Sequence, residues 1–86
     1  MNEFLLEITT PEGNVFGGQA VQLSVRSVAG ELAVMAGHVP FVATLVAGDC
    51  RVYMPDGEKK NATYEGGLLV VTKEKTTMIT PSFKWN

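Results

Sequence analysis

The sequence predicts an all-β domain, a flattened β-sandwich or barrel of about ten strands with no substantial helix. Two observations carry this prediction: apolar and polar residues alternate over much of the 86-residue chain, and turn residues recur at short intervals. Apolar residues nowhere recur at helical spacing over three turns. The length suits one domain. We place it at residues 1–80, with residues 81–86 as a short C-terminal tail.

The expected strands follow in order along the chain. FLLEITT (4–10), AVQLSVRSV (20–28) and DCRVYM (49–54) alternate between apolar and polar residues, so each predicts a strand with one buried face. LLVVT (68–72) is apolar on both faces, which indicates a central strand or one that is covered on its outer side.

Glycine, proline and short polar clusters separate these segments. MPDG (54–57) predicts the sharpest turn, because proline presets φ and Asp-Gly suits the positions after it. KEK (73–75) predicts a second hairpin, and FGG (16–18), VAGD (46–49) and EGG (65–67) also have turn composition. The glycine pairs in FGG and EGG match no phosphate-binding motif, so we expect bulges or tight corners there.

Composition and charge argue against several function classes. The net charge is −2, from 7 Lys and Arg against 9 Asp and Glu, and no basic patch suggests a nucleic-acid partner. The single cysteine cannot form an internal disulfide, which favours a reducing compartment. No apolar segment approaches the roughly 20 residues that span a bilayer. The start, MNEFLLEI, is acidic where a secretory signal would be basic. These features predict a soluble cytoplasmic protein.

The chain offers no constellation for catalysis or metal binding. His38 is the only histidine and Cys50 the only cysteine, so neither a nucleophilic triad nor the ligand set of a zinc site can be assembled. We therefore predict no catalytic, cofactor-binding or metal-binding residues. An enzyme is the weakest class, and a β module for binding or a structural subunit is favoured.

The segment around His38 is better explained as a shaped corner. Gly37 tolerates backbone angles that other residues avoid, and Pro40 favours an extended residue before it. Glu31 is either a solvated charge at a turn or a charge presented to a partner.

Three segments together resemble a known family. AGELAVMAGHVPFVATLVAGDCRV resembles the G-E-L-G-hydrophobic-x-P-G-H-x-P stretch of the epsilon subunit of F-type ATP synthases. The matching positions are Gly30, Glu31, Leu32, Val34, Gly37, His38, Pro40, Leu45 and Gly48. LLEITTPEGNVFGG and YEGGLLVVTKEKTTMIT look like the family's flanking hairpins, in the same order, so the resemblance covers residues 3–80.

The resemblance implies a ten-stranded β-sandwich in the central rotor stalk of the synthase. Such a subunit is non-catalytic and binds no cofactor in this domain. It links the gamma subunit to the polar loops of the membrane c-ring, so that proton-driven rotation is coupled to ATP synthesis on other subunits. The implied location is the cytoplasmic face of the bacterial membrane, with membrane contact only through the complex. The alternative left open by the residues is a free-standing β-sandwich that binds a small ligand or a peptide.

The resemblance also implies an interface. Its residues are Glu31, Met35, His38, Val39, Pro40 and Phe41. Glu31 matches the acidic loop position expected to meet the c-ring, His38 and Pro40 match the adjoining corner, and the apolar residues are expected to cover it.

Typical members continue into a C-terminal helical hairpin, which restrains ATP hydrolysis and in some members binds ATP. The resemblance does not cover such a hairpin, so we do not assign these two functions to this chain. We expect a natural short form in which the alternating Phe83 and Trp85 of the tail cover apolar sandwich surface; the other interpretation is a frayed terminus.

Overall fold

The computed structural model describes residues 2–37 and 39–86, which form eight strands and no helix. The strands are β1 (Phe4–Thr10), β2 (Gly13–Ala20), β3 (Gln22–Ser27), β4 (Gly30–Met35), β5 (Phe41–Tyr53), β6 (Lys59–Val71), β7 (Thr76–Ile79) and β8 (Phe83–Trp85). They join in one sheet of order β2-β1-β7-β6-β5-β3-β4, with β8 beside β6. All pairs are antiparallel except β1 with β7.

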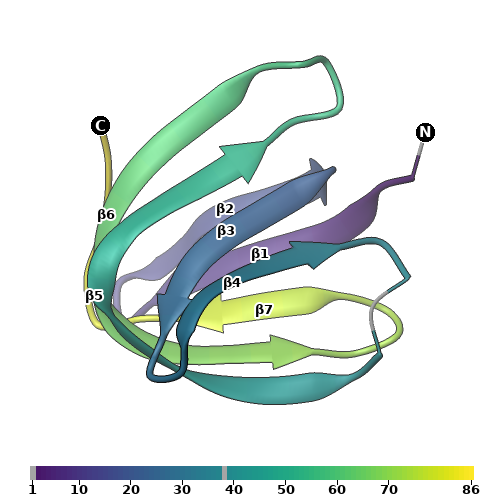
Figure 1. Cartoon of the computed structure of the whole chain (residues 1–86). Helices are drawn as coiled ribbons and strands as arrows, with labels where there is room; N and C mark the ends of the chain where they lie inside the picture. Colours follow the sequence, from purple (N-terminus) through teal and green to yellow (C-terminus); the bar gives the residue numbers. More distant parts are fainter. Residues whose placement is uncertain (1, 38) are drawn as a thin grey trace.

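The two longest strands turn this one sheet into two layers. β5 and β6 have 13 residues each and curve together around the rest of the chain (Figure 1). The C-terminal half of β6 pairs with β7, while its N-terminal half pairs with β8. One layer therefore holds β2, β1 and β7, and the other holds β8, β3 and β4, with β5 and β6 serving both. The predicted all-β sandwich is confirmed, and the expected count of about ten strands is reached because β5 and β6 each contribute to both layers.

The core lies between the layers and follows the predicted alternation. The largest fully buried side chains are Leu6, Ile8, Leu23, Leu69 and Met78. They come from β1, β3, β6 and β7, so both layers contribute to one cluster. In β6 the buried Leu69 and Val71 alternate with residues that point outward.

The bend of β6 is located at a glycine pair. Gly66 and Gly67 have φ of +93° and +130°. A side chain at Gly67 would collide with the carbonyl oxygen of Ile79 and would approach the Cα of Thr80 to 2.9 Å. Only glycine provides both the backbone angle and the close approach. The corner expected at EGG is confirmed, although it lies within one strand.

Two other clusters with turn composition also lie inside strands, which corrects their interpretation as turns. FGG is part of β2, and VAGD is part of β5. At VAGD the chain does bend: β3 meets β5 at Ser24–Arg51 and again at Ser27–Leu45, so several β5 residues leave the β3 ladder. Composition shows that the backbone is permissive at such sites, but it does not show whether pairing to a neighbour continues.

A tyrosine satisfies the backbone where β3 and β5 separate. The Tyr64 hydroxyl accepts a hydrogen bond from the Arg26 N–H at 2.9 Å and donates one to the Arg26 carbonyl at 3.0 Å. Burial raises the pKa of Tyr64 above its ordinary value of 10.0, so the phenol keeps the proton that it donates. The bend of β5 therefore leaves no unpaired polar group at the Arg26 backbone.

The C-terminal tail is a strand of the sandwich. Phe83 lies opposite Tyr64 and Trp85 opposite Ala62, so both aromatic rings face the core and pack against it. Trp85 also meets Phe16 of β2 edge to face at 6.1 Å, which joins the two layers along this side. The hypothesis that Phe83 and Trp85 cover apolar surface is confirmed.

Cys50 is a core residue of β5. Its side chain is fully buried, and burial raises the pKa of the thiol from 9.0 to about 12, with the nearby Arg51 lowering it by a smaller amount. The thiolate, which is the reactive form of cysteine, is therefore disfavoured.

We predict that Gly67→Ala destabilises the domain by about 3 kcal/mol or more, because the new methyl group requires both a strained φ and a shift of the β7–β8 backbone. Urea unfolding would measure the change. Gly17→Ala is the matched control, since nothing lies within 4 Å of the position that a Gly17 Cβ would occupy and its φ is not positive. Equal effects of the two substitutions would contradict a close-packed corner.

The raised pKa of Cys50 predicts a pH dependence of stability. Below pH 9 the thiol is protonated in both states, whereas between pH 9 and 12 the unfolded chain loses a proton that the folded chain keeps. The free energy of unfolding should fall with pH there, by up to about 1.4 kcal/mol per pH unit. Cys50→Ala should flatten this slope between pH 9 and 10, before Tyr64 begins to contribute. Parallel slopes for the two proteins would contradict the burial effect.

Candidate partner-binding surfaces

The predicted interface residues fall into two groups at opposite ends of β4. Glu31 is near the start of β4 and Met35 at its end, which is about 13 Å apart at 3.3 Å per residue. Val39, Pro40 and Phe41 follow Met35, and His38 lies outside the described residues. The resemblance implied a single interface that contains both the Glu31 carboxylate and the apolar residues. In the structure these two groups lie at opposite ends of β4.

The Glu31 end forms what we call the turn site, made of Arg26, Val28, Glu31 and Arg51. The Glu31 carboxylate lies 3.9 Å from Arg26 and 4.0 Å from Arg51. Val28 is at the tip of the β3–β4 turn with 67% of its surface exposed. Val28 was not predicted as a site residue; its signal in the sequence is an apolar residue inside the turn SVAG.

The backbone of this turn is held in place by its own hydrogen bonds. The Ser27 hydroxyl donates to the Gly30 carbonyl at 2.9 Å and accepts from the Ala29 N–H at 3.1 Å. The Val28 N–H donates to the Thr44 carbonyl of β5 at 3.0 Å. These bonds fix the direction in which Val28 is presented.

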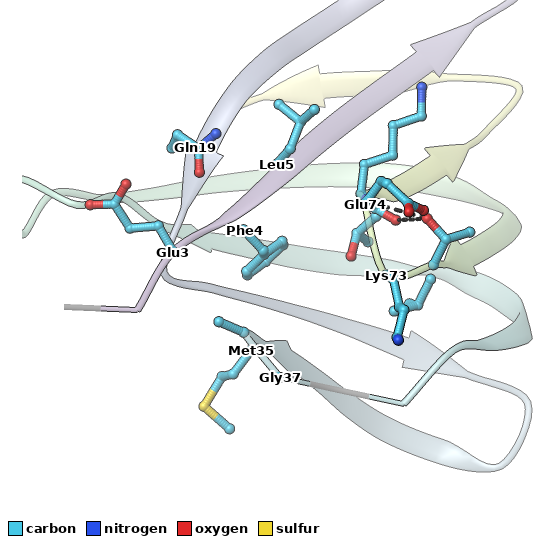
Figure 2. A pocket seen from close by; sticks show the side chains of 13 residues that line it. Glu3, Phe4, Leu5, Gln19, Met35, Gly37, Lys73 and Glu74 are labelled. Carbon is cyan, nitrogen blue, oxygen red and sulfur yellow. Dashed lines mark hydrogen bonds between the residues drawn. The ribbon is translucent and has the colours of Figure 1, made fainter.

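The other end contains an open cleft of about 550 Å³. Figure 2 shows Met35 and Gly37 across the cleft from Glu3 and Phe4, with Lys73 and Glu74 on the β6–β7 turn beside them. Lys75 of the same turn pairs with Glu7 at 3.0 Å. The lining mixes apolar groups with both signs of charge, so it does not select one ligand class.

The apolar residues beside the cleft differ in exposure. Val39 is 75% exposed and Met35 is 46% exposed. Pro40 is also exposed, whereas Phe41 is half-buried and packs against the core. Phe41 thus has a structural role in β5 besides any contact with a partner.

A third surface is the outward face of β5, β6 and β7, which we call the apolar face. It consists of Val42, Leu68, Val70 and Ile79. Val42 is opposite Val70, and Leu68 is opposite Ile79, so the four side chains are neighbours across three strands. Val42, Leu68 and Ile79 are 64%, 38% and 45% exposed.

The sequence indicated this surface only in part. The segment LLVVT predicted a central strand or one covered on its outer side, and β6 is central, with neighbours on both edges. Of its outward residues, Leu68 is nevertheless exposed and Val70 is half-buried. A contiguous exposed apolar patch, unlike a single exposed residue, is typical of a protein contact.

The described part of the chain lacks a metal-binding cluster and a membrane-spanning helix. Among residues 2–37 and 39–86, no group of three or more His, Cys, Asp or Glu side chains is placed to hold a metal ion. In the same part of the chain, no helix is long and apolar enough to cross a membrane. The three surfaces can bind a partner by apolar contact and by charge.

The chain is similar to known proteins in sequence. Residues 3–86 match the family model described as ATP synthase, Delta/Epsilon chain, beta-sandwich domain. The sodium ion specific ATP synthase epsilon chain of Acetobacterium woodii is 30% identical over 82 residues, which are 95% of this chain and 62% of that protein. The ATP synthase epsilon chain of Staphylococcus aureus (strain JH9) is 40% identical over 80 residues, 92% of this chain and 59% of that protein. The chain spans less than two thirds of these relatives.

Solved structures show the same fold. A chain in the mitochondrial ATP synthase of Euglena gracilis, a structure of OSCP, F1 and c-ring, matches with a TM-score of 0.92 at 22% identity, covering 99% of this chain and 54% of that one. A chain in the central stalk and c-ring structure of the Tetrahymena thermophila mitochondrial synthase matches with a TM-score of 0.78 at 8% identity, covering 93% of this chain and 64% of that one.

Proposed function

The chain belongs to the ATP synthase delta/epsilon chain family, and from this membership we propose that it is a non-catalytic subunit of the central stalk. In this role it links the gamma subunit to the polar loops of the c-ring, so that rotation of the ring is coupled to ATP synthesis on other subunits. The bacterial relatives support a place on the cytoplasmic face of the membrane, reached through the complex.

The observation that carries this proposal is the apolar face. Its four side chains sit on three adjacent strands, in a sheet whose register is fixed on both sides of β6. Two uncharged residues, Thr44 and Thr77, lie beside these four side chains on the same face. The centre of the patch therefore carries no charge. An exposed apolar patch of this kind gains stability when another protein covers it. We assign it to the gamma subunit.

The turn site is the proposed contact with the c-ring. It lies at the far end of β4 from the cleft and combines an exposed apolar tip with charged groups. Polar loops of a membrane protein would meet such a surface through charge and hydrogen bonds. The apolar face and the turn site therefore suit two different partners, as a linking subunit requires.

The structure also suits a mechanical role. β5 and β6 run unbroken through the corner, so both layers share continuous strands. The rings of Phe16 and Trp85 join the layers on another side. A subunit that transmits rotation needs such links, because layers that slid against each other would absorb the movement.

The cleft is the observation behind the alternative function, a free-standing module that binds a small ligand or peptide. Its volume of about 550 Å³ is within the range of ligand sites. It is, however, open and lined by side chains of both charge signs, whereas ligand sites are mostly concave and apolar. The apolar face remains unexplained under this alternative, so we favour the rotor role.

We predict that Val42→Glu weakens binding to purified gamma subunit by at least about tenfold, because the contact would bury an unpaired charge. Calorimetric titration would measure the affinity. Val28→Glu is the matched control, since it makes the same change at a similarly exposed valine, 67% against 64%, on a different surface. An equal loss for both variants would argue against the apolar face, and no binding of the unaltered chain to gamma at micromolar concentration would argue against the rotor role.

A further inference from the structure

The turn site contains two guanidinium groups around one carboxylate, and we propose that it binds a carboxylate carried by a loop of its ring partner. This inference rests on the proposed function and specifies the chemistry of that contact. It differs from the expectation implied by the family resemblance, in which Glu31 itself would meet the c-ring.

Glu31 is already surrounded by positive charge from its own chain. The Nη2 atoms of Arg26 and Arg51 approach its two carboxylate oxygens at 3.9 and 4.0 Å. A guanidinium from a partner would have to approach this carboxylate against two like charges. Within about 4 Å of Glu31, an approaching carboxylate meets two cations and one group of its own sign.

The two arginines also have donors to spare. Both separations from Glu31 exceed hydrogen-bond length, so these ion pairs leave the guanidinium N–H groups available. The Nε of Arg51 is buried, so a partner reaches Arg51 only through its other guanidinium N–H groups. Arginine binds carboxylates through parallel N–H donors, and an incoming carboxylate can accept from these accessible groups.

The arginines are positioned by the sheet. Arg26 lies over Gly48 of the bent β5, with its Cδ and Nε 3.8 Å from the position that a Gly48 Cβ would occupy. Arg51 projects from β5 opposite Ser24 on the neighbouring strand. Their side chains keep 57% and 40% of their surface exposed, so both are held in place and still accessible.

One further carboxylate must be considered. Asp49 precedes Arg51 by two residues on β5, which puts it on the same face of the strand, and it is exposed. Within the described residues it forms no ion pair with either arginine. Asp49 thus offsets part of the positive charge that a partner meets at long range. It does not occupy the guanidinium N–H groups of Arg26 and Arg51 that face Glu31.

Val28 gives the contact an anchor that exposed charges alone would lack. Isolated surface ion pairs contribute little to binding, because water and salt screen them. The 67% exposed Val28 stands on a hydrogen-bonded turn two residues after Arg26, so a partner loop that covers it would also exclude water from the neighbouring Arg26 and Glu31. The site therefore fits a short loop with an apolar residue next to Asp or Glu.

The experiment compares single substitutions in the full chain bound to gamma, measuring affinity for the isolated c-ring in detergent. We expect Arg51→Gln to weaken ring binding about tenfold, the effect of losing one charge-assisted hydrogen bond. Glu31→Gln should leave the affinity unchanged or raise it, because it removes competition for the arginines. Lys73→Gln is the control, since it removes the same charge at the cleft end of the molecule.

The outcomes separate this inference from the proposed function. Weaker ring binding by Glu31→Gln, with no effect of Arg51→Gln, would overturn it in favour of a cationic partner group. Equal losses for Arg51→Gln and Lys73→Gln would also overturn it, since only net charge would matter. Gamma binding without any ring binding would reject the inference and the ring contact together, whereas failure to bind gamma would reject the rotor role itself. Thermal unfolding of each variant verifies that the fold is intact.

Discussion

The close contact between Gly67 and the backbone of Ile79 and Thr80 is the constraint on which this fold depends. It allows β6 to turn a corner while the chain leaving β7 follows the same edge of β6 round the bend. On the far side of the corner the Glu65 N–H donates to the Ser82 carbonyl at 3.1 Å, and β8 begins. Because this segment stays beside β6 through the bend, β7 and β8 pair with the same strand but belong to different layers.

The corner also explains the polar network around Tyr64. When β5 follows β6 through the bend, it separates from β3, and the Arg26 backbone would lose its partners. The Tyr64 hydroxyl provides both a donor and an acceptor at this point. Burial that leaves a backbone group unpaired is costly, so the bend and the tyrosine depend on each other.

The two layers present different chemistry outward, and this difference organises the proposed function. The layer with β7 exposes the apolar face, whereas the layer with β3 and β4 exposes the arginines and Glu31 of the turn site. A subunit that joins one apolar and one polar partner requires such an asymmetry.

The sequence by itself determined the alternation of the strands, core positions such as Leu6 and Leu23, the corner at EGG and the family resemblance, because period and glycine placement are local properties of the chain. It also placed Phe83 and Trp85 on one face. Only the tertiary structure decided that VAGD bends inside a strand and that Glu31 and Met35 lie at opposite ends of β4. It alone placed Arg51 beside Glu31 and aligned Val42 with Val70. Those relations depend on pairing between distant segments, and pairing is set by the register across the sheet, which a single strand's pattern does not encode.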